Sequence, residues 1–291
     1  MPLRHVALAL LVVAIWGFNF VVIKLSVHAL PPILAAALRF LLAAVPAMIF
    51  VRPPRAPWRL VVGYGLSFGF ALYSLLNLSL FFGMPAGLAS LVLQVQAFFT
   101  TLFAFLLLGE RPRLPQIAGA GIAFGGIALI ALQQGAGASL GPLALTVGAA
   151  IAWGVANVLT KKAGRVDAVA FTVWGSAVAP LPLLALSLLV EGPATILAAL
   201  TGFSWWDAGL IAFLAYPATL LGAGIFAWLL GRHPASTVAP FTLLVPITGL
   251  LSGSLVLGEP LTGLDIAGGG LVIAGLAITV LRPRGTRAVA S

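Results

Sequence analysis

Long apolar stretches, separated by short polar connections, run through the whole sequence. Each is close to the roughly 20 residues that a helix needs to cross the ~30 Å hydrocarbon layer of a bilayer. Proline, glycine and charged residues mark the ends of the stretches, which lie at about 6–27, 32–51, 59–82, 85–108, 114–133, 142–161, 168–190, 206–230, 235–257 and 263–281. The sequence therefore predicts an all-α integral membrane protein with ten transmembrane helices.

The composition agrees with lipid as the solvent. Of the 291 residues, 62% are hydrophobic and 7% are charged, whereas a soluble domain carries about 25% charged residues. A formal net charge of +9 would suggest nucleic acid as the partner of a soluble protein. Because membrane proteins collect Lys and Arg on their cytoplasmic side, we expect a lipid bilayer and no nucleic acid.

The basic residues alternate between successive connections in a way that orients the chain. With both termini in the cytoplasm, thirteen of the fifteen Lys and Arg residues fall at cytoplasmic helix ends. The opposite connections hold acidic residues and no basic residue except Lys24 near a helix end. The cytoplasmic set is Arg4, Arg52, Arg55, Arg59, Arg111, Arg113, Lys161, Lys162, Arg165, Arg232, Arg282, Arg284 and Arg287. Such asymmetry predicts cytoplasmic N- and C-termini.

One phrase of the sequence occurs twice. Residues 106–130 and 255–279 align without gaps, with ten of 25 positions identical, but only the first copy has Arg111 and Arg113 in its connection. Five spans per copy place the two connections on opposite sides of the membrane, so their charges differ. We therefore predict two inverted five-helix repeats, residues 1–136 and 137–291, around a central cavity, which is a known plan of transporters.

A second, weaker pair of segments supports the repeat. "AIWGFNFVVIK" at 14–24 resembles "IAWGVANVLTK" at 151–161 and aligns Trp16 with Trp153 and Lys24 with Lys161. These Trp-Gly motifs, the "LRF" of 38–40 and the two Leu-Gly-Glu motifs before a glycine-rich stretch resemble the EamA-type, ten-helix transporters of the drug/metabolite transporter superfamily. The resemblance covers almost the whole chain.

The resemblance implies a basket of ten helices that exports amino acids or related metabolites across the bacterial inner membrane by alternating access. The likeness is greatest to bacterial exporters of aromatic amino acids, which implies aromatic or large neutral substrates. Export of a drug or another small metabolite remains the alternative. Ten helices supply many internal packing partners, so we expect a protein that functions as a monomer.

Other function classes lack their required residues. There is no Cys, and the three His residues lie apart near helix ends, so we expect no metal site and no cofactor. No H-E-x-x-H motif, paired aspartates or Ser-His pair lies at membrane depth, which argues against an intramembrane enzyme. Nothing singles out the charged or carbonyl-lined pore of a channel.

Polar residues in the middle of membrane helices are the best indicators of the cavity, because they are costly in lipid and face the bundle interior. Interhelical hydrogen bonding is an equal alternative for the asparagines, as core packing is for the two tryptophans. The predicted substrate-binding residues are Trp16, Asn19, Tyr73, Asn77, Gln94, Gln96, Trp153, Asn157, Tyr216 and Thr242.

For three charged residues we expect structural roles in or beside the membrane helices. Arg39 lies near the middle of the second stretch, where a bare cation costs at least about 2.5 kcal/mol. We favour a structural clamp to backbone carbonyls or a distant acid, with a substrate carboxylate as the other possibility. Glu110 and Glu259 occupy mirrored helix ends, where we expect them to accept backbone N–H bonds at the start of the helix that follows.

Small residues and prolines predict where helices approach closely or bend. The motif Gly121-x3-Gly125 in the fifth stretch predicts close helix contact. Pro85, Pro217, Pro240 and Pro246 predict bends in the fourth, eighth and ninth helices.

Overall fold

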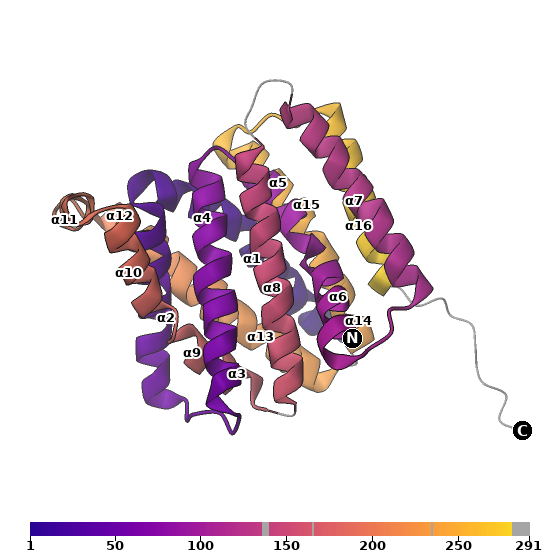
Figure 1. The fold of residues 1–291 in the computed structure, drawn as a ribbon, viewed down its shortest axis with the longest axis horizontal. Helices are drawn as coiled ribbons and strands as arrows, with labels where there is room; N and C mark the ends of the chain where they lie inside the picture. The colour runs from indigo at the N-terminus through magenta and orange to yellow at the C-terminus, as the bar shows by residue number, and fades with distance from the viewer. Residues whose placement is uncertain (136–139, 165, 234, 281–291) are drawn as a thin grey trace, which may run out of the picture.

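The computed structural model describes residues 1–135, 140–164, 166–233 and 235–280, and this part of the chain is helical throughout (Figure 1). Nine membrane-length apolar helical segments occur in it, and α16 is a shorter apolar helix at the tenth predicted position. The all-α class is therefore confirmed. The segments in chain order are α1 (Leu3–Ala29), α2 (Pro32–Phe50), α3–η1–α4 (Trp58–Tyr64, Gly65–Leu72, Tyr73–Phe81), α5–η2–α6 (Ala86–Val92, Leu93–Val95, Gln96–Leu108), α7 (Leu114–Gly135), α8 (Gly141–Ala163), α9–α10 (Ala168–Ser176, Pro180–Val190), α12–η3–α13 (Trp205–Phe213, Leu214–Leu221, Gly222–Arg232), α14–η4–α15 (Ala235–Val238, Ala239–Leu244, Val245–Leu257) and α16 (Gly263–Val280).

One helix outside this set, α11 (Pro193–Thr201), was not predicted. It projects from the bundle at the left of Figure 1 and buries none of its side chains. It begins after Gly192, whose φ of +83° suits glycine, and it has a proline in its first turn, a common way to start a helix. Because α11 has only nine residues, it is too short to appear in a search for membrane-spanning stretches.

Four of the crossing segments are interrupted by non-α turns, at matching places in the two halves. The third and eighth contain the π-helices η1 and η3, and the fourth and ninth contain the 3₁₀ segments η2 and η4. Pro217 lies in η3 and Pro240 in η4, whereas Pro246 lies in the first turn of α15 and Pro85 directly before α5. The segments η1 and η2 contain no proline. Irregular backbone at membrane depth is tolerated where protein buries it or where it lines a cavity.

The first helix of each half packs against the fourth helix of the other half, α1 against α15 and α8 against α6. The glycine of each Trp-Gly motif makes the close approach. A Cβ on Gly17 would lie 1.9 Å from Thr248 Oγ1, and a Cβ on Gly154 would lie 2.8 Å from Phe99 Cβ. Phe99 and Thr248 correspond when the ungapped alignment of the two copies is extended towards the N-terminus, so the two seams are equivalent.

The helices α7 and α16 form a pair at one edge of the bundle (Figure 1). A Cβ on Gly119 would lie 2.4 Å from the Gly275 carbonyl oxygen, and a Cβ on Gly268 would lie 2.7 Å from that of Gly126. The prediction for Gly121-x3-Gly125 is wrong, because nothing lies within 4 Å of a Cβ at either position. The contact uses glycines seven residues apart instead.

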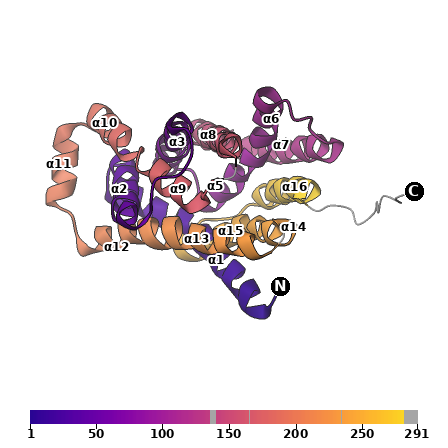
Figure 2. The ribbon, with the colours of Figure 1, turned by 90° about the horizontal axis from the view of Figure 1, so that it is seen from below.

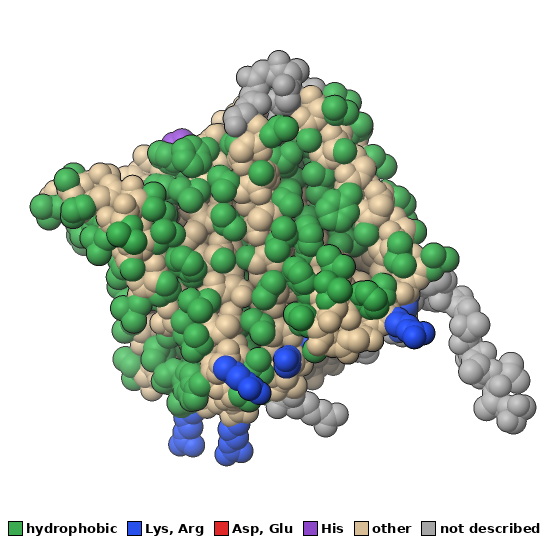
Figure 3. Space-filling model, in the orientation of Figure 1, with side chains coloured by type: hydrophobic (Ala, Val, Ile, Leu, Met, Phe, Trp, Pro, Cys, Tyr) green, Lys and Arg blue, Asp and Glu red, His purple; other side chains and the backbone are tan. Residues whose placement is uncertain are grey.

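The outer surface of the bundle is apolar, and its basic side chains gather at one end. Figure 3 shows hydrophobic side chains over the face in view and Lys and Arg side chains along its lower edge. Viewed from below (Figure 2), α3, α8 and α7 lie on one side of the bundle and α12, α13 and α15 on the other. The binding cavity described next lies between residues of the two halves.

Candidate binding cavity

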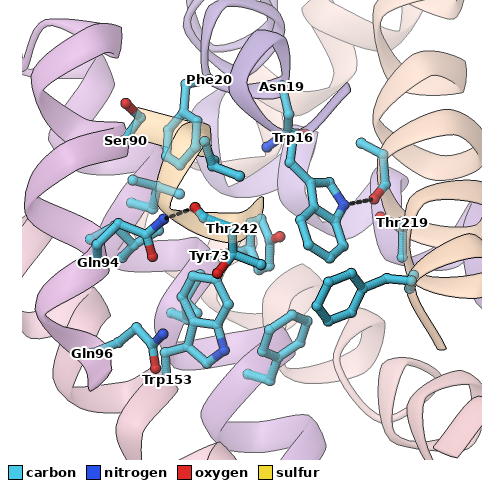
Figure 4. A pocket seen from close by; sticks show the side chains of 18 of the residues that line it. Trp16, Asn19, Phe20, Tyr73, Ser90, Gln94, Gln96, Trp153, Thr219 and Thr242 are labelled. Carbon is cyan, nitrogen blue, oxygen red and sulfur yellow. Dashed lines mark hydrogen bonds between the residues drawn. The ribbon is translucent and has the colours of Figure 1, made fainter. Parts of the chain in front are cut away.

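A cavity of about 330 Å³ lies between the two halves. Side chains from the first four crossing segments of each half line it, and among the described residues none from α7 or α16 does so. The structure brings eight residues singled out in the sequence to its wall (Figure 4 labels seven of them): Trp16, Asn19, Arg39, Tyr73, Gln94, Gln96, Trp153 and Thr242.

The interrupted helices carry several of these residues. Gln94 lies in η2, Thr242 in η4 and Thr219 in η3, and Tyr73 directly follows η1. Gln94 Nε2 donates to the Thr242 carbonyl at 3.4 Å, which links the two 3₁₀ segments across the cavity wall (Figure 4). The irregular backbone therefore lies where helix carbonyls and side chains meet the cavity, as expected for functional breaks in helices.

Aromatic rings form much of the wall. Trp16 Nε1 donates to the Ala218 carbonyl at 3.1 Å, which fixes the indole, and the Trp16 ring centroid lies 5.2 Å from that of Phe226. The centroids of Trp153 and Phe68 are 6.0 Å apart at 73°. Such rings offer apolar surface, and an aromatic ligand gains about 0.5–1.5 kcal/mol from each well-placed ring pair.

Arg39 supplies the cavity's charge. Its side chain is 3% exposed, and its Nε donates to Thr219 Oγ1 at 3.0 Å. Its Cζ lies 4.3 Å from the Tyr73 ring centroid, within the range of a cation–π contact. The ion pairs in the described part of the chain join other residues. A hydroxyl and a ring therefore hold Arg39, rather than the backbone carbonyls or distant acid that we favoured.

Three of the predicted residues do not line the cavity, and those predictions of their position are wrong. Asn77 Nδ2 donates to the Pro32 carbonyl at 2.8 Å. Asn157 Nδ2 donates to Gln96 Oε1 at 2.7 Å and to Thr100 Oγ1 at 3.0 Å. Both asparagines therefore bridge helices, the alternative considered for them. Tyr216 lies on η3 with 40% of its surface exposed, outside the lining set.

Several lining residues escaped a search based on polarity. Phe20, Tyr64, Phe68 and Phe226 line the cavity, yet aromatic residues in an apolar helix resemble ordinary core residues. A usable signal was their spacing. Phe20 follows Trp16 by four residues and Phe68 follows Tyr64 by four, which puts each pair on one helix face.

The carboxylate of Glu259 joins two other segments of the chain near the ends of their helices. Its Oε1 accepts from Ala86 N at 2.7 Å and lies 3.2 Å from Lys24 Nζ, and its Oε2 accepts from Gly87 N at 3.1 Å. Glu259 thus caps the N-terminus of α5, not that of the helix that follows it, α16. The carboxylate therefore joins α5 to Lys24 of α1.

The mirrored acid at the other end makes a more exposed contact. Glu110 pairs with Lys161, and these residues correspond to Glu259 and Lys24 in the repeat. The exposed fractions of the two side chains are 53% for Lys161 and 46% for Glu110, against 17% for Lys24 and 11% for Glu259. The equivalent ion pair is therefore largely buried at one end of the molecule and about half exposed at the other.

Comparisons with known proteins agree with this architecture. The model of the EamA-like transporter family matches twice, at residues 3–132 and 140–281. A protein of Salmonella typhimurium called "probable amino-acid metabolite efflux pump" is 44% identical over 94% of this chain and 93% of its own. A protein of Escherichia coli with the same description is 41% identical over 97% and 96%.

A solved structure shares the fold. A protein crystal structure matches over 99% of both chains with a TM-score of 0.62 and 21% identity. At that identity the likeness supports the fold alone. From the two family matches and the similarity to both bacterial relatives, the chain belongs to the EamA-like transporter family.

Proposed function

We propose that this protein exports amino acids, with aromatic and other large neutral ones as the main substrates, across a bacterial inner membrane. The two relatives described as probable amino-acid metabolite efflux pumps support the general class. The chemistry of the cavity supports the finer assignment, since aromatic rings line it together with amides and a single cation.

The charge of the wall is the observation that carries the proposal. Arg39 is the charged residue among the described lining residues, and none of these is Asp or Glu. A lipophilic cation would need a buried carboxylate, and a phosphate would need several basic groups. A zwitterion with an apolar side chain suits one cation beside aromatic rings.

Alternating access between the two halves, residues 1–136 and 137–291, is the mechanism that we propose. Mirrored halves can exchange conformations and so open the cavity to either side. The unequal exposure of the Lys24–Glu259 and Lys161–Glu110 pairs suits a state closed at the outer end. The basic residues gathered at the other end support cytoplasmic termini, and the interlocked seams support a monomer that works alone.

Transport by purified protein in proteoliposomes tests the proposal. We expect saturable uptake of labelled tryptophan that unlabelled phenylalanine and leucine inhibit and that aspartate, lysine and a lipophilic cation do not. If the lipophilic cation were the one competitor that inhibited tryptophan uptake, or if the cation itself were taken up saturably, the protein would instead be a drug exporter. Uptake no greater than in empty liposomes, from folded protein, would reject amino acid transport.

A further inference from the structure

We propose that Arg39 binds the carboxylate of the transported amino acid, an inference that rests on the proposed function and specifies how its site selects substrates. The structure contains six buried side-chain polar atoms without a hydrogen-bond partner among the described residues. Two belong to residues that line the cavity, Arg39 Nη1 and Asn19 Oδ1. A cation with an unused donor thus lies at the wall of a cavity whose described lining residues include no acid.

Burial makes this arrangement costly unless a ligand completes it. Arg39 is 3% exposed and lies in a helix that crosses the membrane. A guanidinium has five N–H donors, of which the structure engages Nε with Thr219. An isolated buried charge is strongly unfavourable, and an anionic partner with good hydrogen-bond geometry offsets that cost. A substrate carboxylate would supply both the charge and the acceptors.

The surroundings hold the guanidinium in place and give Nη1 no hydrogen-bond partner among the described residues. Thr219 Oγ1 accepts from Arg39 Nε and donates to the Leu214 carbonyl at 2.8 Å, five residues earlier in the π-helix η3. The Tyr73 ring covers the guanidinium from another side. A guanidinium fixed in this way can meet the two oxygens of a carboxylate with parallel hydrogen bonds, which a lysine cannot reproduce.

The aromatic wall begins beside this cation. Trp16 Nε1 bonds to the carbonyl of Ala218, and Ala218 directly precedes Thr219 in η3. The same turn of η3 therefore positions the ring and the charge. An amino acid whose carboxylate meets Arg39 would then find aromatic surface within reach of its side chain, which explains a preference for large neutral substrates.

The repeat does not duplicate this charge. The corresponding crossing segment of the second half, α9–α10, contains no Lys or Arg. The cavity therefore has one cationic side, and a substrate has one preferred orientation. Arg39 also joins α2 of the first half to η3 of the second, so an occupied site would contact both halves.

Analogues that differ at the carboxylate test the inference in the unmodified protein. Proteoliposomes would take up labelled phenylalanine in the presence of phenylalanine, its amide, 3-phenylpropanoate or phenethylamine. We expect 3-phenylpropanoate to compete and the amide and phenethylamine to be about 10- to 100-fold weaker than phenylalanine, the range for a lost hydrogen bond to a charged group. Equal competition by phenylalanine and its amide would overturn the inference and leave amino acid export standing.

The substitution Arg39→Gln tests the same contact from the protein side. We expect the half-saturation concentration for phenylalanine to rise by about 10- to 100-fold, with inhibition by the amide unchanged. Arg39→Lys should restore only part of the affinity, because lysine keeps the positive charge but lacks the paired N–H donors of the planar guanidinium. A purely structural clamp at Arg39 would instead weaken phenylalanine and its amide alike, and that result would overturn the inference.

Binding measurements separate this inference from the proposed function. If no amino acid is transported, the proposed function fails. The thermal stability of the detergent-solubilised protein then shows whether Arg39 binds a carboxylate. A rise in Tm with 3-phenylpropanoate, absent with phenethylamine and absent in Arg39→Gln, would still support a carboxylate site. No rise in the wild type would reject that site too.

Discussion

Two buried asparagines show how one residue type serves two purposes in this protein. Asn19 and Asn77 are 7% and 2% exposed, and each has an Oδ1 without a partner among the described residues. Asn77 also donates to Pro32 and so links helices, whereas Asn19 lies at the cavity. An unpaired oxygen beside the cavity is the kind of acceptor that a substrate ammonium would need.

Substitution by leucine, of similar size, should separate the two roles. We expect Asn19→Leu to keep or raise thermal stability, by about 1 kcal/mol, because it removes a buried unpaired acceptor. The same change should weaken phenylalanine transport about tenfold. Asn77→Leu should lower stability by about 1 kcal/mol through its lost hydrogen bond and leave the half-saturation concentration unchanged. Tm and uptake measured on both variants check this, and equal effects on transport would contradict it.

A glycine beside η3 lets the Trp16 ring occupy its place. A Cβ on Gly222 would lie 2.6 Å from Trp16 Nε1, whereas nothing lies within 4 Å of a Cβ on Gly224 in the same helix. We expect Gly222→Ala to displace the indole from Ala218 and to reduce tryptophan uptake about tenfold. Gly224→Ala is the matched control and should transport normally. Normal uptake by both variants would show that the position of Trp16 does not govern transport.

At the scale of elements, breaks in helices recur in both halves but arise from different residues. Pro217 accompanies η3, while η1 occupies the corresponding place in the first half with Gly65 and Gly69 and no proline. The common product is a π-turn in the wall of the cavity. Similar geometry from different residues indicates that the turn itself is needed there.

The pair formed by α7 and α16 depends on direct contact between helix backbones. We expect Gly119→Ala to destabilise the protein by roughly 1–3 kcal/mol, because the new Cβ would lie 2.4 Å from the Gly275 carbonyl oxygen and the helices must separate. Gly121→Ala, with nothing within 4 Å, should have no such effect. Tm values of the two variants provide the measurement. A similar loss in both would indicate that helix flexibility, rather than contact, makes these glycines necessary.

At the scale of the whole molecule, the two mirrored ion pairs differ in how deeply they are buried. Lys24–Glu259 is nearly closed off and adds the capping of α5, whereas Lys161–Glu110 is about half exposed. Exposed ion pairs contribute little to stability. The buried pair is therefore the one whose loss should shift the balance between the two open states.

Labelling of a single introduced cysteine would detect such a shift, because the chain has no native Cys. With Ser90→Cys at the cavity wall, we expect Lys24→Met to raise the rate of labelling by an impermeant maleimide from outside about fivefold. That corresponds to about 1 kcal/mol. Lys161→Met should not raise it. Equal rates in the two variants would mean that the Lys24–Glu259 pair does not hold the outer end closed.

Sequence reasoning succeeded where the membrane itself imposes a rule. A span needs a certain apolar length, so the ten segments were visible, and the repeat aligned the Trp-Gly motifs whose glycines, Gly17 and Gly154, make the mirrored seams. Gln94 and Thr242 were found because a polar group in lipid needs a reason to be there. Each of these inferences depends on one residue or one segment and on the solvent around it.

The errors concern facts that only packing decides. Asn157 could have faced the cavity, but Gln96 and Thr100 satisfy its amide. Phe68 could have been a core residue, yet it lines the cavity. Glu259 caps a helix that lies far from it in sequence, so no local pattern revealed its partner.

The crossing of the two halves also determines the order in which the chain can assemble. Helix α1 leaves the ribosome first, yet Thr248 of α15, which donates to the Val13 carbonyl of α1, follows 235 residues later. The seam between α6 and α8 can close much earlier, because only α7 separates those helices along the chain. Until α15 is inserted, the glycine face of α1 has lipid in place of its partner. A nascent chain that stops before α15 thus exposes an unfilled seam, which makes it a natural substrate for membrane proteases.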